Sequence, residues 1–488
     1  MKKSLCSLII MFFITAIMIF TGCSNKGLED NPSKTAQVVS NGGMTVVKGD
    51  YLYYVNGFVD RANLDVKKDN KFGDVEKGAI YRTKLNDNSE IAKDSEGFLE
   101  KTECVVPKVV GFDNGGFYII DDYIYYATPN MNLSSDGKPQ TDRVEFHKIN
   151  IDGTDDKLVY STEKAEAKLD WSVYKVDDKV YILTYCDGKI ISVDTETEKT
   201  VATIENSTSY AFYYENNYST NNTRNSEHLR YVYYTRNAGE DDNFSANRKG
   251  NMLCKFDVSK GEEIVLDAEL NCTYLIKQIM KSGVESYLYY TKANSEFNGL
   301  ALLYKSNITS GWNLSNEIKM TNKVYTNYFI CDFGNDLMFA SDDSATYRIN
   351  KDGNGNIIAT KIFTSAQTIL GVYGGYAYYN SEGILRRFNA YSNDITDGVI
   401  NTTYACDDSY KTMLDKSNYI DFDNQRIYIY AEYTSANATT NFYLNYVTFV
   451  ENEAEQRFVG QFENDHLPKA PEEEKDENGE VINIPHVN

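Results

Sequence analysis

The sequence predicts an all-β protein built as a single β-propeller, and three observations lead to this prediction. A tyrosine-rich strand, first seen as YLYYVNG at residues 51–57, recurs along most of the chain. Tyrosine is unusually abundant, with 40 copies among 488 residues, and aromatic and β-branched residues favour strands. Long stretches with the 3.6-residue apolar period of helices are absent, so a helical solenoid is not indicated.

The recurring strand defines repeats of about 54 residues, a period typical of propeller blades with several strands each. Its copies begin near residues 51, 123, 180, 231, 287, 336, 376 and 427. The count predicts eight four-stranded blades, with seven as the alternative if the first unit is split or an irregular pair of units merges. The unit at 171–204 is the most compact, because DD, DG and TETEK divide it into four short runs. Asp and Gly at these breaks predict hairpin turns.

The motif also indicates where its strand lies within a blade. In residues 51–55, Tyr51, Tyr53 and Val55 point to one side, whereas Leu52 and Tyr54 point to the other. Both faces are apolar or aromatic, so the strand requires cover on both sides. An inner blade strand between neighbouring blades provides this cover, and the tyrosine hydroxyls can reach a polar rim. The tyrosine stripe is therefore interpreted as core.

Two long insertions interrupt the repeats, at residues 58–78 in the first unit and 237–251 in the fourth. Loops on a rigid scaffold commonly carry binding residues. The insertions are the first places to look for a ligand contact.

The motifs GDYLYYVNG…GAIYRTKLNDN, DDYIYYATPN…FHKINIDGTDDKLVY and GGYAYYNSEGILRRFNA carry a resemblance to a known family. They resemble uncharacterised bacterial lipoprotein β-propellers related to the low-density-lipoprotein-receptor (YWTD-like) type. The resemblance spans most of residues 41–465. It implies the propeller fold and, because no activity defines the family, implies no catalytic residues.

The N-terminus has the layout of a bacterial lipoprotein signal. Lys2 and Lys3 precede an apolar run over residues 5–20, and small residues stand directly before Cys23. We expect a signal peptide at 1–22, with Cys23 as the acylated (palmitate-type) N-terminus of the mature protein. Phe20 departs from the usual leucine of this motif. The alternative is an uncleaved anchor, although the run is slightly short for a membrane span of about 20 residues.

The rest of the chain divides into three parts. Residues 23–40 form a polar tether, 41–465 the propeller and 466–488 an acidic tail typical of disorder. The formal net charge of −22 disfavours nucleic acid as a partner, because phosphate binding needs clustered Lys and Arg. We expect a monomer, lipid-anchored at the extracytoplasmic face of the cell membrane.

The cysteines give no redox or zinc motif. After the leader and Cys23, the sequence contains Cys104, Cys186, Cys254, Cys272, Cys331 and Cys406, without a C-x-x-C pair. Export permits disulfides, and Cys254 and Cys272 are the closest pair in sequence. Strand-like surroundings favour buried thiols instead.

Catalytic motifs are absent from the sequence. The four histidines are scattered, and His147 in EFHKIN is interpreted as a strand residue on a solvated face. Glycosidase-type chemistry by two carboxylates remains open, since such enzymes need acids about 5–10 Å apart. The pairs Asp121–Asp122 and Asp342–Asp343 are interpreted as turn residues. No cofactor is expected.

Two weak ligand candidates remain. Asp352, Asn354 and Asn356 have the spacing of a calcium loop, but Phe363 stands where such a loop places Glu, and a hairpin turn is the preferred interpretation. Trp312, in TSGWNLSN, could stack on a sugar or peptide, or cover the edge of a blade.

These observations predict an envelope lipoprotein whose propeller is a non-catalytic binding or scaffolding module for an envelope protein, peptide or glycan. The alternative is a propeller enzyme that acts on extracellular polysaccharide through carboxylates at its central channel.

Overall fold

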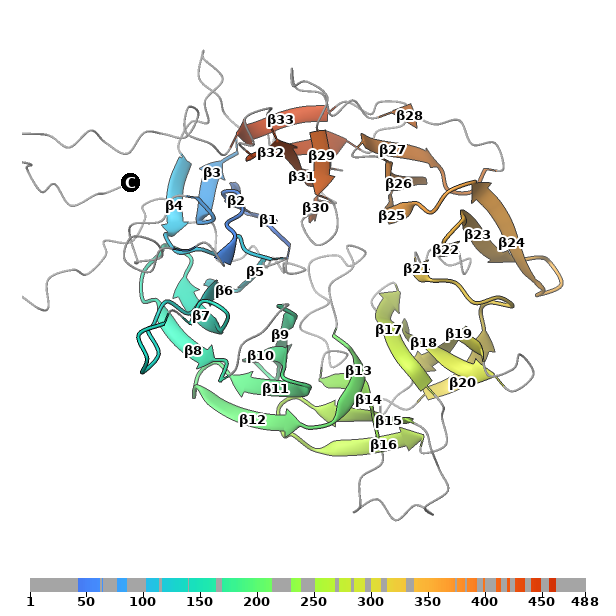
Figure 1. Cartoon of the computed structure of the whole chain (residues 1–488), viewed down its shortest axis with the longest axis horizontal. Helices are drawn as coiled ribbons and strands as arrows, with labels where there is room; N and C mark the ends of the chain where they lie inside the picture. Colours follow the sequence, from blue (N-terminus) through green and yellow to red (C-terminus); the bar gives the residue numbers. More distant parts are fainter. Residues whose placement is uncertain are drawn as a thin grey trace, which may run out of the picture.

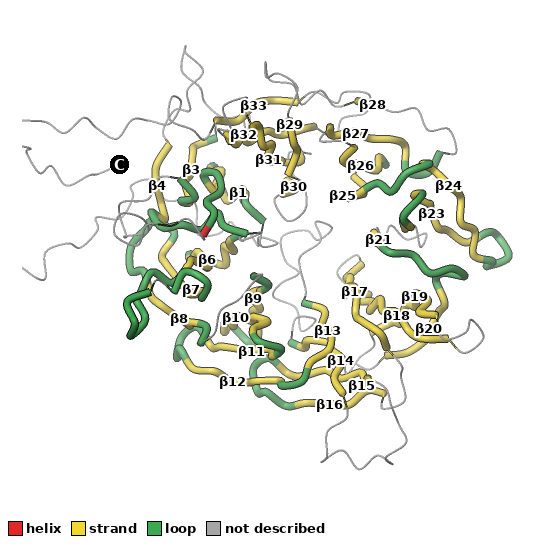
Figure 2. The backbone as a smooth tube through the Cα atoms, in the orientation of Figure 1, coloured by secondary structure: helices red, strands yellow, loops and turns green. Residues whose placement is uncertain are grey.

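A computed structural model describes the chain as an all-β molecule. The described residues are 43–61, 64, 77–85, 102–113, 116–138, 140–163, 169–212, 230–237, 251–267, 272–281, 285–294, 300–308, 314–330, 338–373, 375–381, 384–392, 398–399, 410–413, 419–421, 426–434, 440–448 and 456–461. Within these ranges the chain forms strands and the loops that join them, with no α-helix; the short red segment in Figure 2 is a 3₁₀ turn at Arg61.

The first half of the chain forms four antiparallel sheets, each a meander of four consecutive strands. Their strands are β1 (Thr45–Lys48), β2 (Tyr51–Val55), β3 (Ile80–Lys84) and β4 (Thr102–Val106); β5 (Phe117–Ile120), β6 (Tyr123–Pro129), β7 (Val144–Asn150) and β8 (Lys157–Ser161); β9 (Trp171–Val176), β10 (Lys179–Cys186), β11 (Lys189–Asp194) and β12 (Lys199–Ile204); β13 (Ser207–Ala211), β14 (Tyr231–Asn237), β15 (Asn251–Asp257) and β16 (Glu263–Asp267).

The second half continues with three four-stranded sheets and one of five strands. Their strands are β17 (Cys272–Lys281), β18 (Glu285–Asn294), β19 (Leu300–Ile308) and β20 (Leu314–Lys319); β21 (Asn327–Ile330), β22 (Met338–Asp342), β23 (Ala345–Lys351) and β24 (Ile357–Phe363); β25 (Thr368–Tyr373), β26 (Tyr376–Ser381), β27 (Ile384–Asn389) and β28 (Gly398–Val399); β29 (Tyr410–Met413), β30 (Tyr419–Asp421), β31 (Arg426–Thr434), β32 (Thr440–Thr448) and β33 (Gln456–Gln461). In the last sheet β30 pairs with β31 beside the four-stranded path.

The sheets stand around a common axis in chain order (Figure 1). In the sheets β5–β8 and β9–β12, for example, the first strand faces the axis and the fourth lies at the rim. This arrangement is that of a β-propeller, as the recurring strand predicted.

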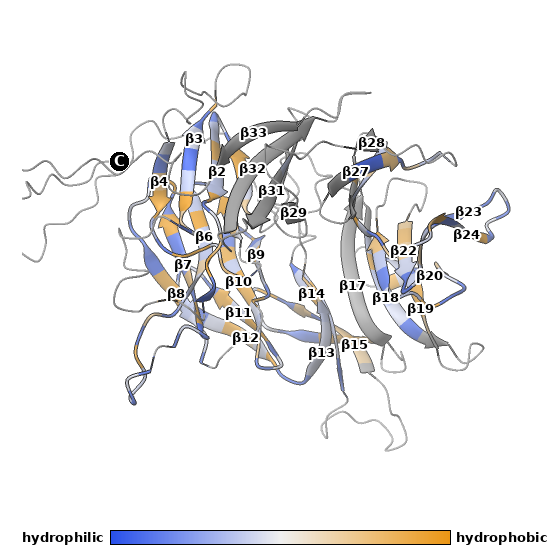
Figure 3. Ribbon diagram, turned by 45° about the horizontal axis from the view of Figure 1, so that its top comes forward, coloured by the Kyte–Doolittle hydropathy of each residue, from blue (hydrophilic) through white to orange (hydrophobic). Residues whose placement is uncertain are grey.

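The recurring tyrosine strand is the second strand of its sheet in every repeat, from β2 to β31. All five residues of β2 are buried, and Tyr53 and Tyr54 on opposite faces have no exposed surface. The prediction that both faces of this strand need cover is confirmed. Apolar stretches likewise run through the middle of strands such as β10 and β11 (Figure 3).

The turns predicted from Asp and Gly are also confirmed in the unit at 171–204. Asp177 and Asp178 join β9 to β10 with φ angles of 49° and 63°. Asp187 and Gly188 join β10 to β11 with φ angles of 50° and 77°. Both turns need left-handed backbone, which Asp tolerates and Gly adopts at little cost. Asp121–Asp122 and Asp342–Asp343 also lie at turns between strands.

A second feature repeats with the tyrosines: a buried cation on the third strand is stacked over a tyrosine at or near the start of the second strand. The pairs are Arg82 over Tyr51 at 4.4 Å, Lys148 over Tyr123 at 3.9 Å, Lys255 over Tyr231 at 4.6 Å, Lys305 over Tyr287 at 4.0 Å and Arg387 over Tyr376 at 4.3 Å, measured to the ring centroids. Each cation is 7% exposed or less. Burial strengthens cation–π attraction, so these pairs contribute to the core.

The ring closes without a shared sheet. The first sheet contains only strands from the start of the described chain, and the last sheet only strands from its end. The two sheets meet where β1 lies beside β30, and Tyr428 of β31, fully buried, belongs to the same apolar cluster as Tyr53 and Val46. This seam is therefore held by packing between sheets.

Candidate functional site

One face of the ring collects the connections that carry the long insertions. Each four-stranded meander returns the chain to the end at which it began, and the next sheet starts after a short connection, such as the two residues between β12 and β13. The connections between second and third strands therefore emerge at the same face throughout the ring. We call it the insertion face, because the predicted insertions 58–78 and 237–251 lie between β2 and β3 and between β14 and β15.

Arg61 ties two parts of the insertion face together. Its guanidinium forms an ion pair with Asp113, with Nη2 3.0 Å from Oδ2, and donates a hydrogen bond to the main-chain oxygen of Asp142 at 3.3 Å. It also lies 5.8 Å from the ring centroid of Phe112. Arg61 follows β2, and Asp142 precedes β7. The contacts therefore join the loops of neighbouring sheets.

The connection between β6 and β7, residues 130–143, is a hairpin held by its own hydrogen bonds. The Ser134 amide donates to the Lys138 carbonyl at 2.8 Å, and the Gln140 amide donates to the Asn132 carbonyl at 3.1 Å. The Ser134 hydroxyl also donates to the Lys138 carbonyl at 2.9 Å. Leu133 in this hairpin is 56% exposed. The hairpin therefore presents an apolar side chain on a preformed backbone.

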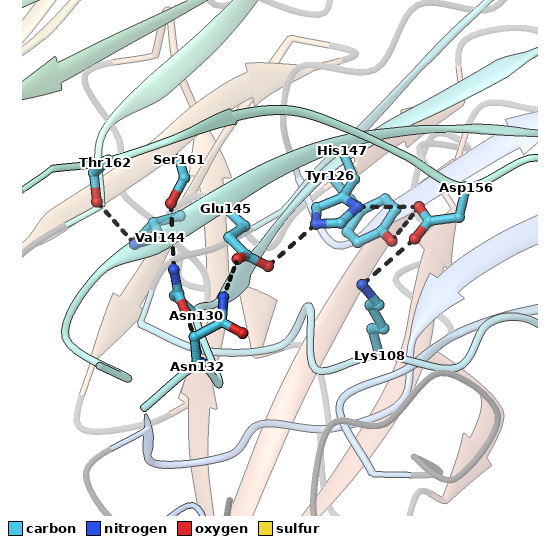
Figure 4. Close-up of polar contacts among 10 residues, drawn as sticks. All are labelled: Lys108, Tyr126, Asn130, Asn132, Val144, Glu145, His147, Asp156, Ser161 and Thr162. Atoms are coloured by element: carbon cyan, nitrogen blue, oxygen red, sulfur yellow. Dashed lines mark hydrogen bonds and ion pairs between the residues drawn. The ribbon is translucent and has the colours of Figure 1, made fainter. Parts of the chain in front are cut away.

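Beneath the hairpin lies a buried polar cluster around His147 of β7 (Figure 4). The imidazole Nδ1 is 3.2 Å from Oδ1 of Asp156, and Nε2 is 3.4 Å from Oε2 of Glu145. The Tyr126 hydroxyl donates to Asp156 at 2.6 Å, and Lys108 Nζ is 3.4 Å from the other Asp156 oxygen. Lys108 comes from the segment between β4 and β5. The cluster thus lies where the sheets β1–β4 and β5–β8 meet.

The cluster holds Asp156 ionised. Burial alone would raise the pKa of this carboxyl, but the hydrogen bond and charge of His147, the charge of Lys108 and the Tyr126 hydroxyl together lower it below its usual range. Burial and the negative charge of Asp156 raise the pKa of Tyr126 well above its ordinary value. The Tyr126 ring stacks on His147 at 5.2 Å and 17°.

A chain of hydrogen bonds leads from His147 to the hairpin, as Figure 4 shows. The other Glu145 oxygen accepts a hydrogen bond from Asn132 Nδ2 at 3.4 Å. The Asn132 amide donates to the Asn130 side chain at 2.8 Å, and Asn130 Nδ2 donates to the Ser161 hydroxyl at 3.3 Å. The buried cluster and the exposed hairpin are therefore one continuous network.

This arrangement favours positioning over catalysis. Both imidazole nitrogens face carboxylate oxygens, so neither has a lone pair directed at a nucleophile or a substrate proton. His147 is 4% exposed. Among the described residues no group of three or more His, Cys, Asp or Glu side chains could hold a metal ion.

The insertion face contains one carboxyl with the opposite behaviour. Burial raises the pKa of Asp113, partly offset by the charge of Arg61 and reinforced by that of Asp60. Its Oδ2 forms the ion pair with Arg61 described above.

Some of the site residues predicted from the sequence lie in the described part of the structure, and others lie outside it. Cys23 and Trp312 lie outside the described residues. Asp352 begins the turn between β23 and β24, where its Oδ1 accepts the amides of Asn354 and Asn356 at 2.8 Å and its Oδ2 accepts Asn356 Nδ2 at 2.9 Å. Gly355 in this turn has a φ of 83°. These side chains thus stabilise a hairpin, which emerges at the face opposite the insertion face.

The sequence interpretation of His147 was wrong. The residue is on a strand as expected, but its side chain is buried between two carboxylates instead of facing solvent. Glu145 and His147 are two residues apart on one strand and therefore share a face, a signal present in EFH. Asp156 and Lys108 come from other segments, and no local pattern assigns them to the cluster.

Three of the six body cysteines can be described. Cys104, Cys186 and Cys254 are thiols, of which Cys186 and Cys254 are buried, as strand-like surroundings predicted. The side chains of Cys272, Cys331 and Cys406 lie outside the described part. No helix among the described residues is long and apolar enough to cross a membrane.

Comparison with known proteins gives distant structural likenesses. No family model matches the chain, and no curated protein matches it. A prolyl endopeptidase structure is similar at 9% identity and a TM-score of 0.39, covering 68% of this chain and 52% of that one. Puromycin hydrolase is similar at 8% identity and a TM-score of 0.42, covering 72% and 54%. The chain thus spans about half the length of these two proteins.

The β-propeller domain of the Trilobed protease from Pyrococcus furiosus is similar along nearly its whole length. The match has 11% identity and a TM-score of 0.35, covering 68% of this chain and 94% of that one. Its description gives that domain an open velcro topology. The fold of the present chain is assigned from its own ring of four-stranded meanders: it is a β-propeller.

Proposed function

We propose that the protein is a lipid-anchored envelope protein whose propeller, of eight blades, is a non-catalytic binding or scaffolding module. Its ligand would be an envelope protein, a peptide or a glycan, bound at the insertion face. Acylation at Cys23 would hold the body at the extracytoplasmic side of the membrane. The tyrosine-strand motifs support kinship with the low-density-lipoprotein-receptor type of propeller.

One observation carries the proposal: the preformed 130–143 hairpin presents Leu133 on the face that also receives both long insertions. A surface that is ordered before binding loses less conformational entropy when a partner docks. Two acids described above already have cationic or imidazole partners. Asp113 forms an ion pair with Arg61, and Asp156 is paired with Lys108 and His147. Binding is therefore the better supported use of the face than acid–base chemistry.

The binding test compares two charge-matched variants of the full chain in detergent micelles. Leu133→Asp with Lys138→Glu changes the insertion face, and Asn354→Asp with Lys351→Glu changes the opposite face by the same charge. Both variants and the wild type are tested for retention on purified envelope glycans and envelope proteins, with released reducing sugar measured in the same wells. We expect retention without sugar release, lost in the first variant and kept in the second.

Two results would contradict the binding proposal. Sugar release that depends on the protein would make it an enzyme, and equal loss of retention in both variants would remove the insertion face from the interaction. Anchoring is tested separately by metabolic labelling with a fatty-acid analogue. Label on the wild type and none on Cys23→Ser is the expected result, whereas label on both would exclude Cys23 as the acylated residue.

A further inference from the structure

The geometry around His147 fixes how many protons its ring needs. Ionised carboxylates only accept hydrogen bonds, and the two ring nitrogens face Asp156 at 3.2 Å and Glu145 at 3.4 Å. Both contacts are favourable only when each nitrogen carries a hydrogen. The network in Figure 4 is therefore complete with the imidazolium form.

The charged and titratable groups around this ring come from four segments. Tyr126 of β6 stacks on it, Glu145 of β7 and Asp156 before β8 face its nitrogens, and Lys108 from the β4–β5 connection faces Asp156. Asp156 stays ionised, because the pKa of its carboxyl is lowered, and Tyr126 stays neutral, because its pKa is raised. Histidine is the side chain that ordinarily exchanges a proton between pH 5 and 8.

We propose that His147 is a proton-dependent latch for the hairpin 130–143. When the ring carries two protons, Glu145 is held between His147 and Asn132, and the base of the hairpin is fixed. When Nε2 loses its proton, its lone pair faces the Glu145 carboxylate, and this contact becomes repulsive. Glu145 then turns away and releases Asn132.

The consequence concerns the surface that the hairpin presents. Asn132 accepts the Gln140 amide through its carbonyl and bonds Asn130 through its amide, so its release loosens both branches of the hairpin beside Leu133. The effect of the latch on binding rests on the proposed function, namely that the insertion face binds a partner. Acidification would order that face and favour binding, and alkaline conditions would weaken it.

Hydrogen exchange tests the latch without any ligand. The full chain in detergent micelles is measured by mass spectrometry from pH 5.5 to 8.5, and each rate is divided by the intrinsic rate at that pH. Protection of residues 131–140 is expected to fall about ten- to hundredfold as pH rises, the loss of one charge-assisted hydrogen bond. The matched control is the hairpin 352–356, held by Asp352, whose lowered pKa keeps it ionised over this range.

His147→Gln assigns the effect to the histidine, because a neutral side chain of similar length cannot gain a second proton. We expect its hairpin to exchange at a rate independent of pH, while the control hairpin behaves as in the wild type. Wild-type protection that does not change with pH would overturn the latch, as would an unchanged pH dependence in the variant. Because no ligand is used, either outcome leaves the binding proposal standing or falling by its own test.

Discussion

The two faces of the sheet β5–β8 are both buried, yet they are built from different chemistry. Toward the sheet β1–β4 the sheet presents Tyr126, His147 and Asp156 in an ion-paired network. Toward the sheet β9–β12 it presents mainly aromatic rings: Phe146 lies 5.4 Å and Tyr118 4.8 Å from Trp171, centroid to centroid. One cation on this face, Lys148, forms an ion pair with Glu196 of the neighbouring sheet. The same strands thus support one polar and one aromatic junction.

The difference between these two faces shows how buried charge is accommodated between the sheets of a propeller. On the aromatic face, stability follows mainly from the area removed from water, and a truncated ring loses that area and leaves a cavity. On the polar face, every ion is costly unless its partners are in place, so the members depend on one another. We therefore expect a substitution to have a local effect on the aromatic face and a coupled effect on the polar face.

The largest effect is expected from Phe146→Ala on the aromatic face. Removing the ring leaves a cavity beside Trp171, at a cost of about 3–5 kcal/mol in the free energy of unfolding. Urea unfolding at pH 7 measures the loss. Phe146→Leu, which retains most of the volume, should cost about 1 kcal/mol. Equal costs for both variants would show that the ring is not packed as described.

On the polar face, Asp156→Asn should cost about 2–3 kcal/mol, because His147 loses a charged partner while remaining buried. The pKa of Asp156 is lowered by folding, so its contribution is present above the pKa of the unfolded carboxyl and is lost as pH falls below about 4. Urea unfolding of both proteins from pH 3 to 7 should show curves that converge at the acid end. A constant difference between them would contradict the ionised role of Asp156.

The polar junction also depends on a turn that admits no side chain. Gly153, between β7 and β8, has a φ of 80°, and a Cβ there would lie 2.9 Å from the Val105 main-chain oxygen of the neighbouring sheet. Gly188 has a φ of 77° with nothing within 4 Å. Alanine at Gly188 should cost about 1 kcal/mol from backbone strain alone, and alanine at Gly153 at least about 2 kcal/mol. Thermal unfolding measures the stability lost in each alanine variant. The loss at Gly188 reports backbone strain alone, and the additional loss at Gly153 reports the steric contact with the neighbouring sheet.

The smallest effect is expected at Lys255, which occupies in the sheet β13–β16 the position of Lys148. Burial lowers the pKa of Lys255 to about 8. The unfolded chain therefore holds this proton more tightly, and the free energy of unfolding should rise with pH from about 8 upward. In urea unfolding, Lys255→Met should reduce this rise relative to wild type. An identical rise in both proteins would mean that Lys255 keeps its proton when folded.

Patterns within single strands predicted most of the fold. Tyr53 and Tyr54 predicted a strand covered on both faces, and Asp177 and Asp178 predicted a tight turn. Both predictions rest on local preferences: the alternation of side chains along a strand and the tolerance of Asp for turns. The order of strands within each repeat followed from the same reasoning, since consecutive hairpins form a meander.

The candidate site was much less predictable. Glu145 and His147 share a face by strand periodicity, but their burial depends on how the first two sheets pack. Lys108 reaches Asp156 from 48 positions earlier in the chain, and such a contact exists only in the folded ring. Cys23 and Trp312 remain predictions of the sequence alone.

The seam described between the first and last sheets has a consequence for inheritance. Because each sheet in the described part of the chain is built from strands that are consecutive in sequence, each repeat corresponds to one continuous run of codons. A single in-frame duplication or deletion of about 54 codons would therefore add or remove one complete structural unit. The ring could change its circumference, and with it the surface offered on the insertion face, without redesigning how any sheet is completed.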